Sequence, residues 1–248
     1  MEFGFGSGIL TGIRNDSGAG AAPTPRRFGA LQDVNIEFTG EIKDLFATQQ
    51  FPIDSARGKT KITGKAKVAE IKASEYNDLF FGQTLATGAL KYAYNESVAA
   101  GTSAVTYTVA NAGSTPLTDE GAFYVANGNQ LNAVTGAPGA GQYTWNPSTG
   151  VYLFATADAS NGFLVNYIYN SSTGYNIAIG NPFMGTTPTF KATLFQQFEG
   201  NQIILALNKC VSTRLTFPTR IDDYMIQELD FSAFADTSGN VGTWNSTN

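Results

Sequence analysis

The sequence of 248 residues contains no histidine and only one cysteine. Without histidine, Ser/His/Asp and Cys/His relays, His-ligated zinc or iron sites and imidazole-based pH switches are excluded. The single cysteine, Cys210, forms neither an intrachain disulfide nor a thiolate zinc site. Because it lies in the apolar run 203–211, we expect a buried, unreactive thiol. No nucleophile, base, metal or cofactor constellation stands out, so the sequence predicts a protein without catalytic activity or cofactor.

Charge and long hydrophobic runs are also scarce. Lys and Arg number 15 against 20 for Asp and Glu, a net charge of −5, and charged residues make up 14% of the chain. A surface rich in Ser, Thr, Asn, Gln and Gly follows, which suits repeated contacts. The acidic balance argues against an open nucleic-acid-binding face. The strongest aliphatic cluster, 203–207, is far shorter than a membrane span, and the absence of a basic, apolar leader predicts cytosolic synthesis.

What is present points to β-structure. Residues 1–27 are rich in glycine and end in prolines and arginines. This composition predicts a flexible N-terminal arm. From residue 28 onward apolar and polar residues alternate, as in a half-buried strand. Asp33 and Glu37 lie on the polar side of that strand, and Val34, Ile36 and Phe38 on the other.

A second long strand is predicted over 59–71. Lysines 59, 61, 65 and 67 share one face of it and apolar residues the other. Two interpretations stay open: a solvated edge strand protected by lysines, or a charge-complementary partner for the Asp33 and Glu37 face. Between the two strands, residues 41–56 include Phe46, Phe51 and Asp54. This stretch predicts a protruding, partly apolar loop that contacts another surface.

The rest of the chain gives an all-β prediction with one short helix. Ser74 is the expected N-cap of that helix and Gly82 its end. Turn signals at regular spacing elsewhere favour a β-sandwich or barrel-like fold. Residues 97–190 contain only three charged residues, Asp119, Glu120 and Asp158. This composition predicts an inserted, neutral β-rich module over 97–188, with longer strands returning after it.

Two further groups have competing interpretations. Asp222 and Asp223, with Glu228 and Asp230 nearby, form the densest acidic cluster, and solvated turn carboxylates are favoured over a cation site. Tyr143, Trp145 and Tyr152 are either core residues of the neutral module or a platform for stacking sugars. The second possibility leads to an alternative function, a carbohydrate-binding or receptor-binding β-sandwich module.

Short stretches at both ends resemble one known family. Residues 28–38, 43–46, 51–52 and 58–65 resemble the tail tube (major tail) proteins of long-tailed bacteriophages, and residues 189–236 are similar to the closing strands of that family. Together they cover a little under half of the chain. The resemblance assigns 28–96 and 189–248 to a tail tube β-sandwich and makes 97–188 an insertion.

The resemblance implies a structural virion protein with no enzymatic role. Its subunits would join laterally into hexameric rings with an internal barrel, and the rings would stack into a hollow tube that delivers DNA to the host. Expected partners are further copies of the chain, tape measure, tail terminator and baseplate or tip proteins, and transiting DNA without specific binding, but no membrane. The protein is expected in the virion after synthesis in the bacterial cytoplasm.

The same resemblance suggests functional residues. The candidates for the lumen or for contacts between subunits are Asp33, Glu37, Lys59, Lys61, Lys65 and Lys67. The candidates for contacts between stacked rings are Phe46, Phe51 and Asp54.

Overall fold

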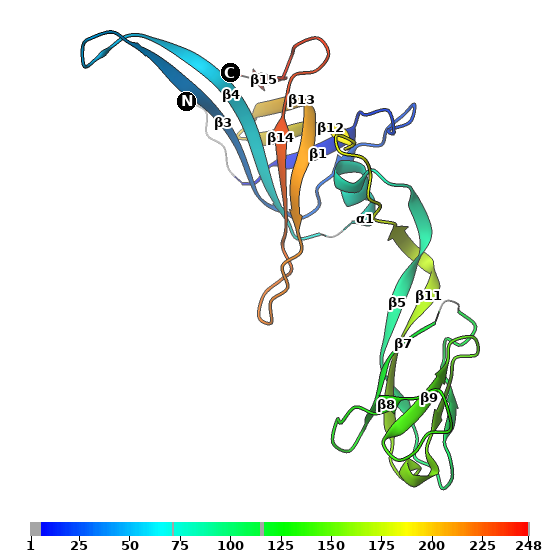
Figure 1. The fold of residues 1–248 in the computed structure, drawn as a ribbon. Coiled ribbons are helices and arrows are strands. Elements are labelled where there is room, and N and C mark those ends of the chain that lie inside the picture. Colours follow the sequence, from blue (N-terminus) through cyan, green and yellow to red (C-terminus); the bar gives the residue numbers. More distant parts are fainter. Residues whose placement is uncertain (1–5, 71, 115–116, 248) are drawn as a thin grey trace. The chain divides into compact units, whose positions relative to one another are not determined.

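The computed structural model describes residues 6–70, 72–114 and 117–247. In these residues the chain is mostly β, with three antiparallel or mixed sheets, one short helix and no closed barrel (Figure 1). The predicted all-β class with a single short helix is confirmed. The chain divides into two compact units, described separately below: unit 1 is Met1–Leu85 with Ile177–Asn248, and unit 2 is Ala86–Asn176. The boundaries expected from charge, 97 and 188, both lie later than these. Unit 2 includes the charged residues Lys91 and Glu96, and unit 1 includes the uncharged stretch 177–190.

Unit 1 is built on one large sheet of antiparallel strands. Its order is β2-β1-β12-β13-β14-β4-β3, with β15 paired beside β13. The strands are β1 (Ile9–Arg14), β2 (Arg26–Arg27), β3 (Leu31–Phe46), β4 (Pro52–Val68), β12 (Thr189–Phe198), β13 (Asn201–Thr216), β14 (Gln227–Ala233) and β15 (Gly242–Ser246). A core that draws on most of these strands, including Leu10, Leu207 and Phe231, lies on one face of the sheet.

The N-terminal region corrects the prediction of a flexible arm. Strand β1 pairs with β12 along all six of its residues, and Leu10 is 1% exposed. At Gly12 a Cβ atom would lie 2.7 Å from Leu79 Cδ2, so this glycine allows a close approach of Leu79. The glycines of this region predicted flexibility, whereas Gly12 permits tight packing. Residues 1–5 of the expected arm lie outside the described residues.

The predicted short helix is present and covers part of the core. Helix α1 (Ala73–Tyr76) continues as the π-helical turn η1 (Asn77–Phe81) and ends at Gly82, whose φ of 66° is left-handed as expected for a helix stop. The predicted cap is wrong: the N-cap is Lys72, without a side-chain cap bond, and Ser74 lies inside the first turn. Leu79 is fully buried, and the Ser212 hydroxyl donates to its carbonyl at 2.6 Å.

A glycine on β4 sets the packing of the core beside it. Gly64 pairs with Phe231 of β14 and Ile36 of β3, and the buried Phe231 ring lies across it. A Cβ atom at Gly64 would lie 2.1 Å from Phe231 Cζ. We therefore expect Gly64→Ala to lower the free energy of unfolding by about 1 to 3 kcal/mol, as overpacking does. Urea unfolding of Gly64→Ala with and without Phe231→Leu measures this. Equal losses in both backgrounds would contradict the packing explanation.

Unit 2 contains two smaller sheets that share one aromatic core. One sheet has the order β5-β11-β7 and the other β6-β10-β9-β8. The strands are β5 (Leu85–Val98), β6 (Thr106–Thr108), β7 (Thr118–Tyr124), β8 (Asn132–Ala133), β9 (Gln142–Asn146), β10 (Val151–Phe154) and β11 (Phe163–Ile177), with a 3₁₀ turn η2 (Thr156–Asp158). Phe154 and Phe163, one from each sheet, stack with ring centroids 3.9 Å apart. The sheets therefore bury their inner faces against each other.

The burial of the unit 2 aromatics decides between their two interpretations. Tyr152 is 0% exposed and Tyr143 is 2% exposed, and both belong to the core. Trp145 packs on Tyr152 with ring centroids 4.4 Å apart. The core interpretation is confirmed for Tyr143 and Tyr152. A sugar-stacking platform made with these two rings is wrong, because neither ring is accessible.

Two acids of unit 2, Asp119 and Glu96, accept hydrogen bonds from the hydroxyls of its tyrosines. Asp119 accepts hydrogen bonds from Tyr143 at 2.6 Å and Tyr152 at 2.7 Å. Glu96 accepts from Tyr107 at 2.7 Å and Tyr167 at 2.6 Å. These bonds allow the tyrosine rings to be buried while their hydroxyls keep hydrogen-bond partners. These two carboxylates are therefore structural.

The tyrosines bound to Glu96 predict a loss of stability in alkali. Burial, and then the hydrogen bond to Glu96, raise the pKa of Tyr107 and of Tyr167 from 10.0 to about 12. Below pH 10 both states keep these protons and the stabilisation is complete. Between pH 10 and 12 only the unfolded state ionises, so stability falls as pH rises. Thermal unfolding from pH 8 to 12 measures the slope, which should be shallower in Tyr107→Phe. An unchanged slope in that variant would contradict the prediction.

Candidate assembly surface

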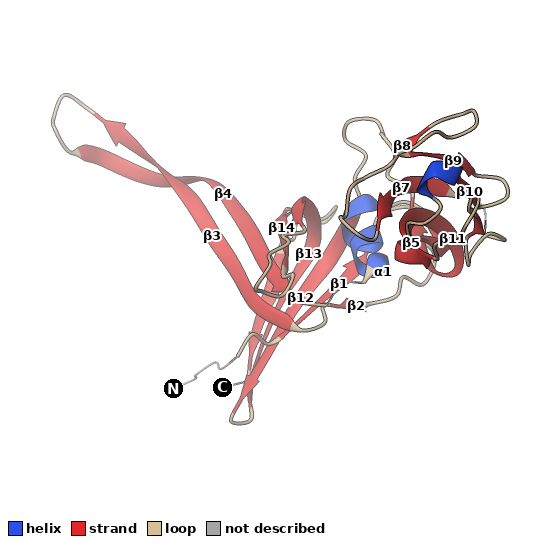
Figure 2. Ribbon diagram, turned by 90° about the horizontal axis from the view of Figure 1, so that it is seen from below, coloured by secondary structure: helices blue, strands red, loops and turns tan. Residues whose placement is uncertain are grey.

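The β3–β4 hairpin extends well beyond the core of unit 1 (Figures 1 and 2). The expected loop over 41–56 is wrong: both strands continue through it, with Lys43 opposite Ala56 and Leu45 opposite Asp54, and only 47–51 connects them. A register shift between Gly40 and Ile42 interrupts the pairing. Bulges of this kind break the alternation by which strands are recognised in a sequence. The hairpin segment 39–61, past the core, is named the projecting ribbon.

One side of the sheet has stripes of alternating charge. Asp33 of β3 is opposite Lys67 of β4, and Lys67 is opposite Glu228 of β14. Asp230, opposite Lys65, is in turn opposite Arg214 of β13. Strand by strand the face is therefore acidic, basic, acidic and basic. It is named the striped face.

The lysines of β4 interact with acids of both neighbouring strands. Lys67 Nζ lies 3.7 Å from Asp33 Oδ2, and Lys65 Nζ lies 3.9 Å from Glu228 Oε2. The charge-complementary interpretation, in which the lysines pair with the Asp33 and Glu37 face, is confirmed for Lys67. Lys65 instead pairs with Glu228 of β14. Each exposed pair contributes only about 0 to 1 kcal/mol to stability. The stripes therefore matter more for which molecules can contact this face than for the stability of the fold.

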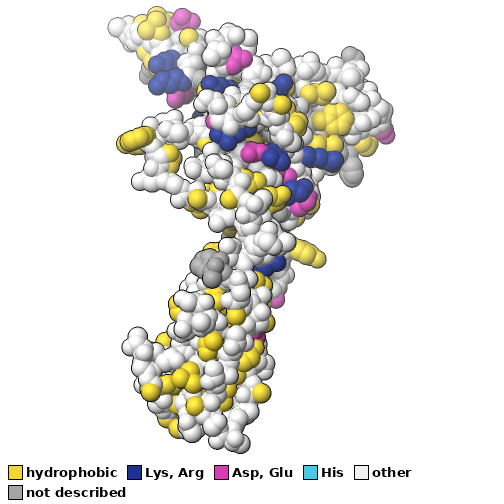
Figure 3. Space-filling model, turned by 90° about the vertical axis from the view of Figure 1, so that its right-hand side faces the viewer, with side chains coloured by type: hydrophobic (Ala, Val, Ile, Leu, Met, Phe, Trp, Pro, Cys, Tyr) yellow, Lys and Arg dark blue, Asp and Glu magenta, His cyan; other side chains and the backbone are white. Residues whose placement is uncertain are grey.

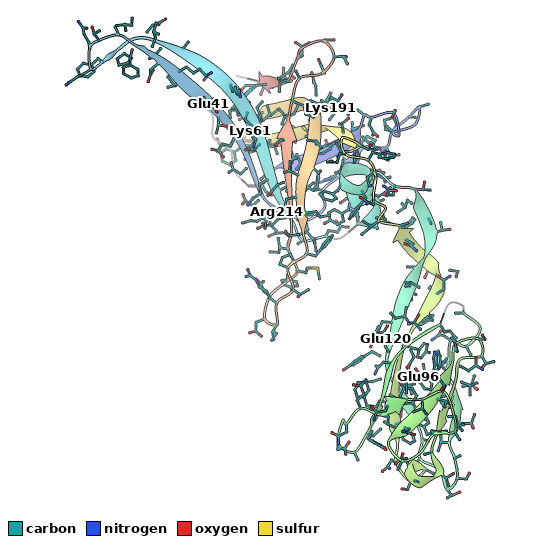
Figure 4. The ribbon with its side chains drawn as sticks, viewed as in Figure 1. Glu41, Lys61, Glu96, Glu120, Lys191 and Arg214 are labelled. Carbon is teal, nitrogen blue, oxygen red and sulfur yellow. The ribbon has the colours of Figure 1, made fainter. Side chains whose placement is uncertain are left out.

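The remaining predicted charges lie farther toward the projecting ribbon. Glu37 is opposite Thr63, and Lys61 is opposite Thr39. Lys59 has the same parity on β4 as Lys61. Within the described part of the chain, Glu37, Lys59 and Lys61 make no ion pair. Figure 4 shows Glu41 and Lys61 on this hairpin. These side chains remain available to a neighbouring molecule.

The other side of β3 carries apolar side chains, and these continue beyond the part of the strand that packs against the core. Val34 and Ile36 pack against the core, and the same parity continues with Phe38, Ile42 and Phe46. Beyond the core these side chains are exposed to solvent, and Ile42 is 73% exposed. Phe51, in the connecting turn, is 80% exposed. Large apolar groups gathered on one projection are typical of a contact surface.

The projecting ribbon is also open along both edges. Among the described strands β3 pairs only with β4, and β14 covers β4 only from Ile62 to Val68. The backbone donors and acceptors on the outer edges of 39–46 and 52–61, which are not used between β3 and β4, therefore face outward. A two-stranded ribbon without a covering layer is at best marginally stable in water. Its open edges are also templates for a further strand.

The predicted stacking residues lie near the end of this ribbon. Phe46 is opposite Pro52, and Asp54 is opposite Leu45 with its carboxylate accepting from the Ser55 amide at 2.8 Å. Phe46, Phe51 and Asp54 are all exposed. The structure thus brings these three residues together at one projection.

A second apolar projection lies at the opposite end of the sheet. Residues 217–226 connect β13 to β14, and β14 runs antiparallel to β4, so this loop and the hairpin turn 47–51 are at opposite ends. Ile221 is 100% exposed and Tyr224 is 86% exposed. The sequence showed the acids of this region, but its exposed apolar residues carried no recognisable pattern. Asp223 pairs with Arg220 at 3.7 Å.

Other candidate chemistry is limited. In the described ranges no group of three or more Cys, Asp and Glu side chains could hold a metal ion, and no helix is long and apolar enough to cross a membrane. Cys210 is buried as predicted, and burial raises the pKa of its thiol to about 12. The thiol is therefore protonated and unreactive at neutral pH.

Comparison with known proteins gives no assignment. No protein-family model matches the chain, and no curated protein matches it.

Proposed function

We propose that this chain is a structural virion protein whose copies form stacked hexameric rings, the hollow tail tube through which a bacteriophage delivers DNA. The projecting ribbon carries this proposal. Its two edges and two faces are open, and it bears exposed Phe46 and Phe51. A segment of this kind gains stability when another molecule covers it. The resemblance of the flanking sequences to tail tube proteins supplies the kind of assembly.

Lateral joining would use the free edge of β3. This strand has 16 residues and is the outermost strand on its side of the sheet. The opposite border ends in the two-residue β2, which leaves most of β1 uncovered. Because the two borders differ, contact between them is heterologous and closes into a ring when the rotation permits.

Stacking would use the two ends of the sheet. The hairpin turn 47–51 and the loop 217–226 project in opposite directions along the strands, and both expose large apolar side chains. A head-to-tail contact between copies would cover both at once. We assign Phe46, Phe51 and Asp54 to this contact.

The striped face is our candidate for the channel lining. Its Asp33 and Glu37 repel phosphates, and its lysines at 65 and 67 are paired with acids. A wall of unpaired lysines would hold DNA through counterion release. Alternating stripes avoid this at Lys65 and Lys67, so DNA would pass this part of the wall without specific binding.

Negative-stain electron microscopy of the purified full-length protein tests the proposal. We expect rings or hollow tubes that become more numerous with protein concentration. A species that remains monomeric at high concentration in both low and high salt would contradict the proposal. The alternative function, a sugar-binding module based on Tyr143, Trp145 and Tyr152, loses its main support because two of these rings are buried.

A further inference from the structure

Unit 2 contains an open polar cleft. Its described lining includes none of the residues assigned to assembly. It lies between the β5–β11 ribbon and the turn that follows Val109, and all its lining residues belong to unit 2. Among the described residues that line it, Lys91 is the only charged side chain and none carries a carboxylate. The cleft therefore differs from the rest of the protein, in which acids outnumber bases.

The lining is made of groups that form hydrogen bonds. Hydroxyls come from Thr87, Ser114, Ser171, Ser172 and Thr173, and side-chain amides from Asn111 and Asn170. Tyr169 supplies the aromatic surface. A mixture of hydroxyls, amides and one ring, with a single cation, matches a ligand that carries many hydroxyls and one negative group.

Parts of this lining are held in place before any ligand arrives. Asn111 Nδ2 donates to the Tyr167 hydroxyl at 2.9 Å, which leaves its side-chain oxygen as an acceptor. The hydroxyl oxygens of Ser171 and Thr173 lie 3.1 Å apart. Tyr169 packs on Tyr167 with ring centroids 5.9 Å apart. Groups that are already oriented lose less entropy on binding.

Low surface charge around the cleft favours an uncharged polymer body over a nucleic acid or a protein partner. Within unit 2, Glu96 and Asp119 are engaged with tyrosines, and Asp158 accepts from the Gly141 amide at 2.6 Å. On the face shown in Figure 3, charged side chains gather over unit 1, while unit 2 shows mostly uncharged ones. Phosphate backbones need several cations, whereas this cleft offers one.

We infer that the cleft binds a saccharide with an acidic group, with that group at Lys91 and the sugar hydroxyls on the surrounding Ser, Thr and Asn side chains. This site is separate from the buried Tyr143 and Tyr152. It does not depend on the assembly of copies into hexameric rings.

A glycine in the lining provides a blocking variant. A Cβ atom at Gly113 would contact no described atom within 4 Å, and its φ is not left-handed, so Gly113→Trp places an indole in the cleft without strain. Gly136 has the same properties but does not line the cleft, so Gly136→Trp is the matched control. Lys91→Met removes the cation and Lys91→Arg keeps it.

Full-length protein is applied to an array that carries neutral saccharides (maltotriose, chitotriose) and acidic ones (sialyllactose, trigalacturonate), and hits are measured by calorimetry. We expect acidic saccharides to bind wild type and Gly136→Trp. We expect Gly113→Trp to lose binding and Lys91→Met to weaken it at least tenfold, with recovery in Lys91→Arg. No binding, binding unchanged in Gly113→Trp, or equal binding of neutral saccharides would each overturn the inference.

Discussion

The triple variant Ile42→Ser, Phe46→Ser, Phe51→Ser is expected to abolish rings and tubes while leaving the fold intact. Burial of a large apolar side chain contributes about 1.5 to 3 kcal/mol, so the three changes remove roughly 4 to 9 kcal/mol from each contact. In the isolated chain the three side chains are exposed, and surface changes of this kind usually alter stability by less than about 0.5 kcal/mol. Electron microscopy and sedimentation velocity measure assembly, and thermal unfolding measures the fold.

A matched control uses an exposed aromatic residue of unit 2. Tyr94 is exposed on β5, far along the chain from the projecting ribbon. Tyr94→Ser should assemble like wild type. Normal tubes in the triple variant would remove the ribbon from the contact, and equal loss of tubes in Tyr94→Ser would show that the effect is not specific to it.

The second large effect concerns stability. Asp119→Ala is expected to lower the free energy of unfolding of unit 2 by about 1 to 3 kcal/mol, because it leaves the buried Tyr143 hydroxyl without a partner. The Tyr152 hydroxyl keeps its bond to the Asn166 carbonyl at 3.2 Å. Tyr143 and Tyr152 are buried with their hydroxyls directed to this one carboxylate, which also accepts from the Gly121 amide at 3.0 Å. Hydrogen exchange of amides in unit 2 measures the change.

The neighbouring acid provides the comparison. Glu120 is exposed and lies next to Asp119 on β7 (Figure 4). Glu120→Ala removes the same charge without touching the tyrosines, so it should change stability by less than about 0.5 kcal/mol. Similar losses in both variants would attribute the effect to net charge and contradict the role of the hydrogen bonds.

The sequence predicted the fold class because local alternation is strong wherever a strand has one buried face. The inner parts of β3 and β4 were recognised in this way. Strand β1 was missed because Gly12, a contact point for Leu79, has the local appearance of a flexible residue. The outer half of the β3–β4 hairpin was missed because both of its faces are exposed and its register shifts. Both errors concern tertiary context that a local pattern does not contain.

The candidate surface could be predicted in part. The residue types at 33, 37 and 59–67 indicated charged faces, but only the cross-strand register shows that Lys65 and Lys67 interact with acids on two neighbouring strands. The polar cleft escaped notice because its lining combines two strands, β5 and β11, with the turn after Val109, and the apolar loop 217–226 because it is an irregular segment. Such segments carry no periodicity for a sequence argument to use.

The placement of turn 47–51 and loop 217–226 at opposite ends of one sheet gives each copy a direction. A filament built by repeating one head-to-tail contact inherits that direction, so its two tips expose different surfaces. Subunits would then add to the two tips at different rates, and a protein that terminates growth would recognise one tip only.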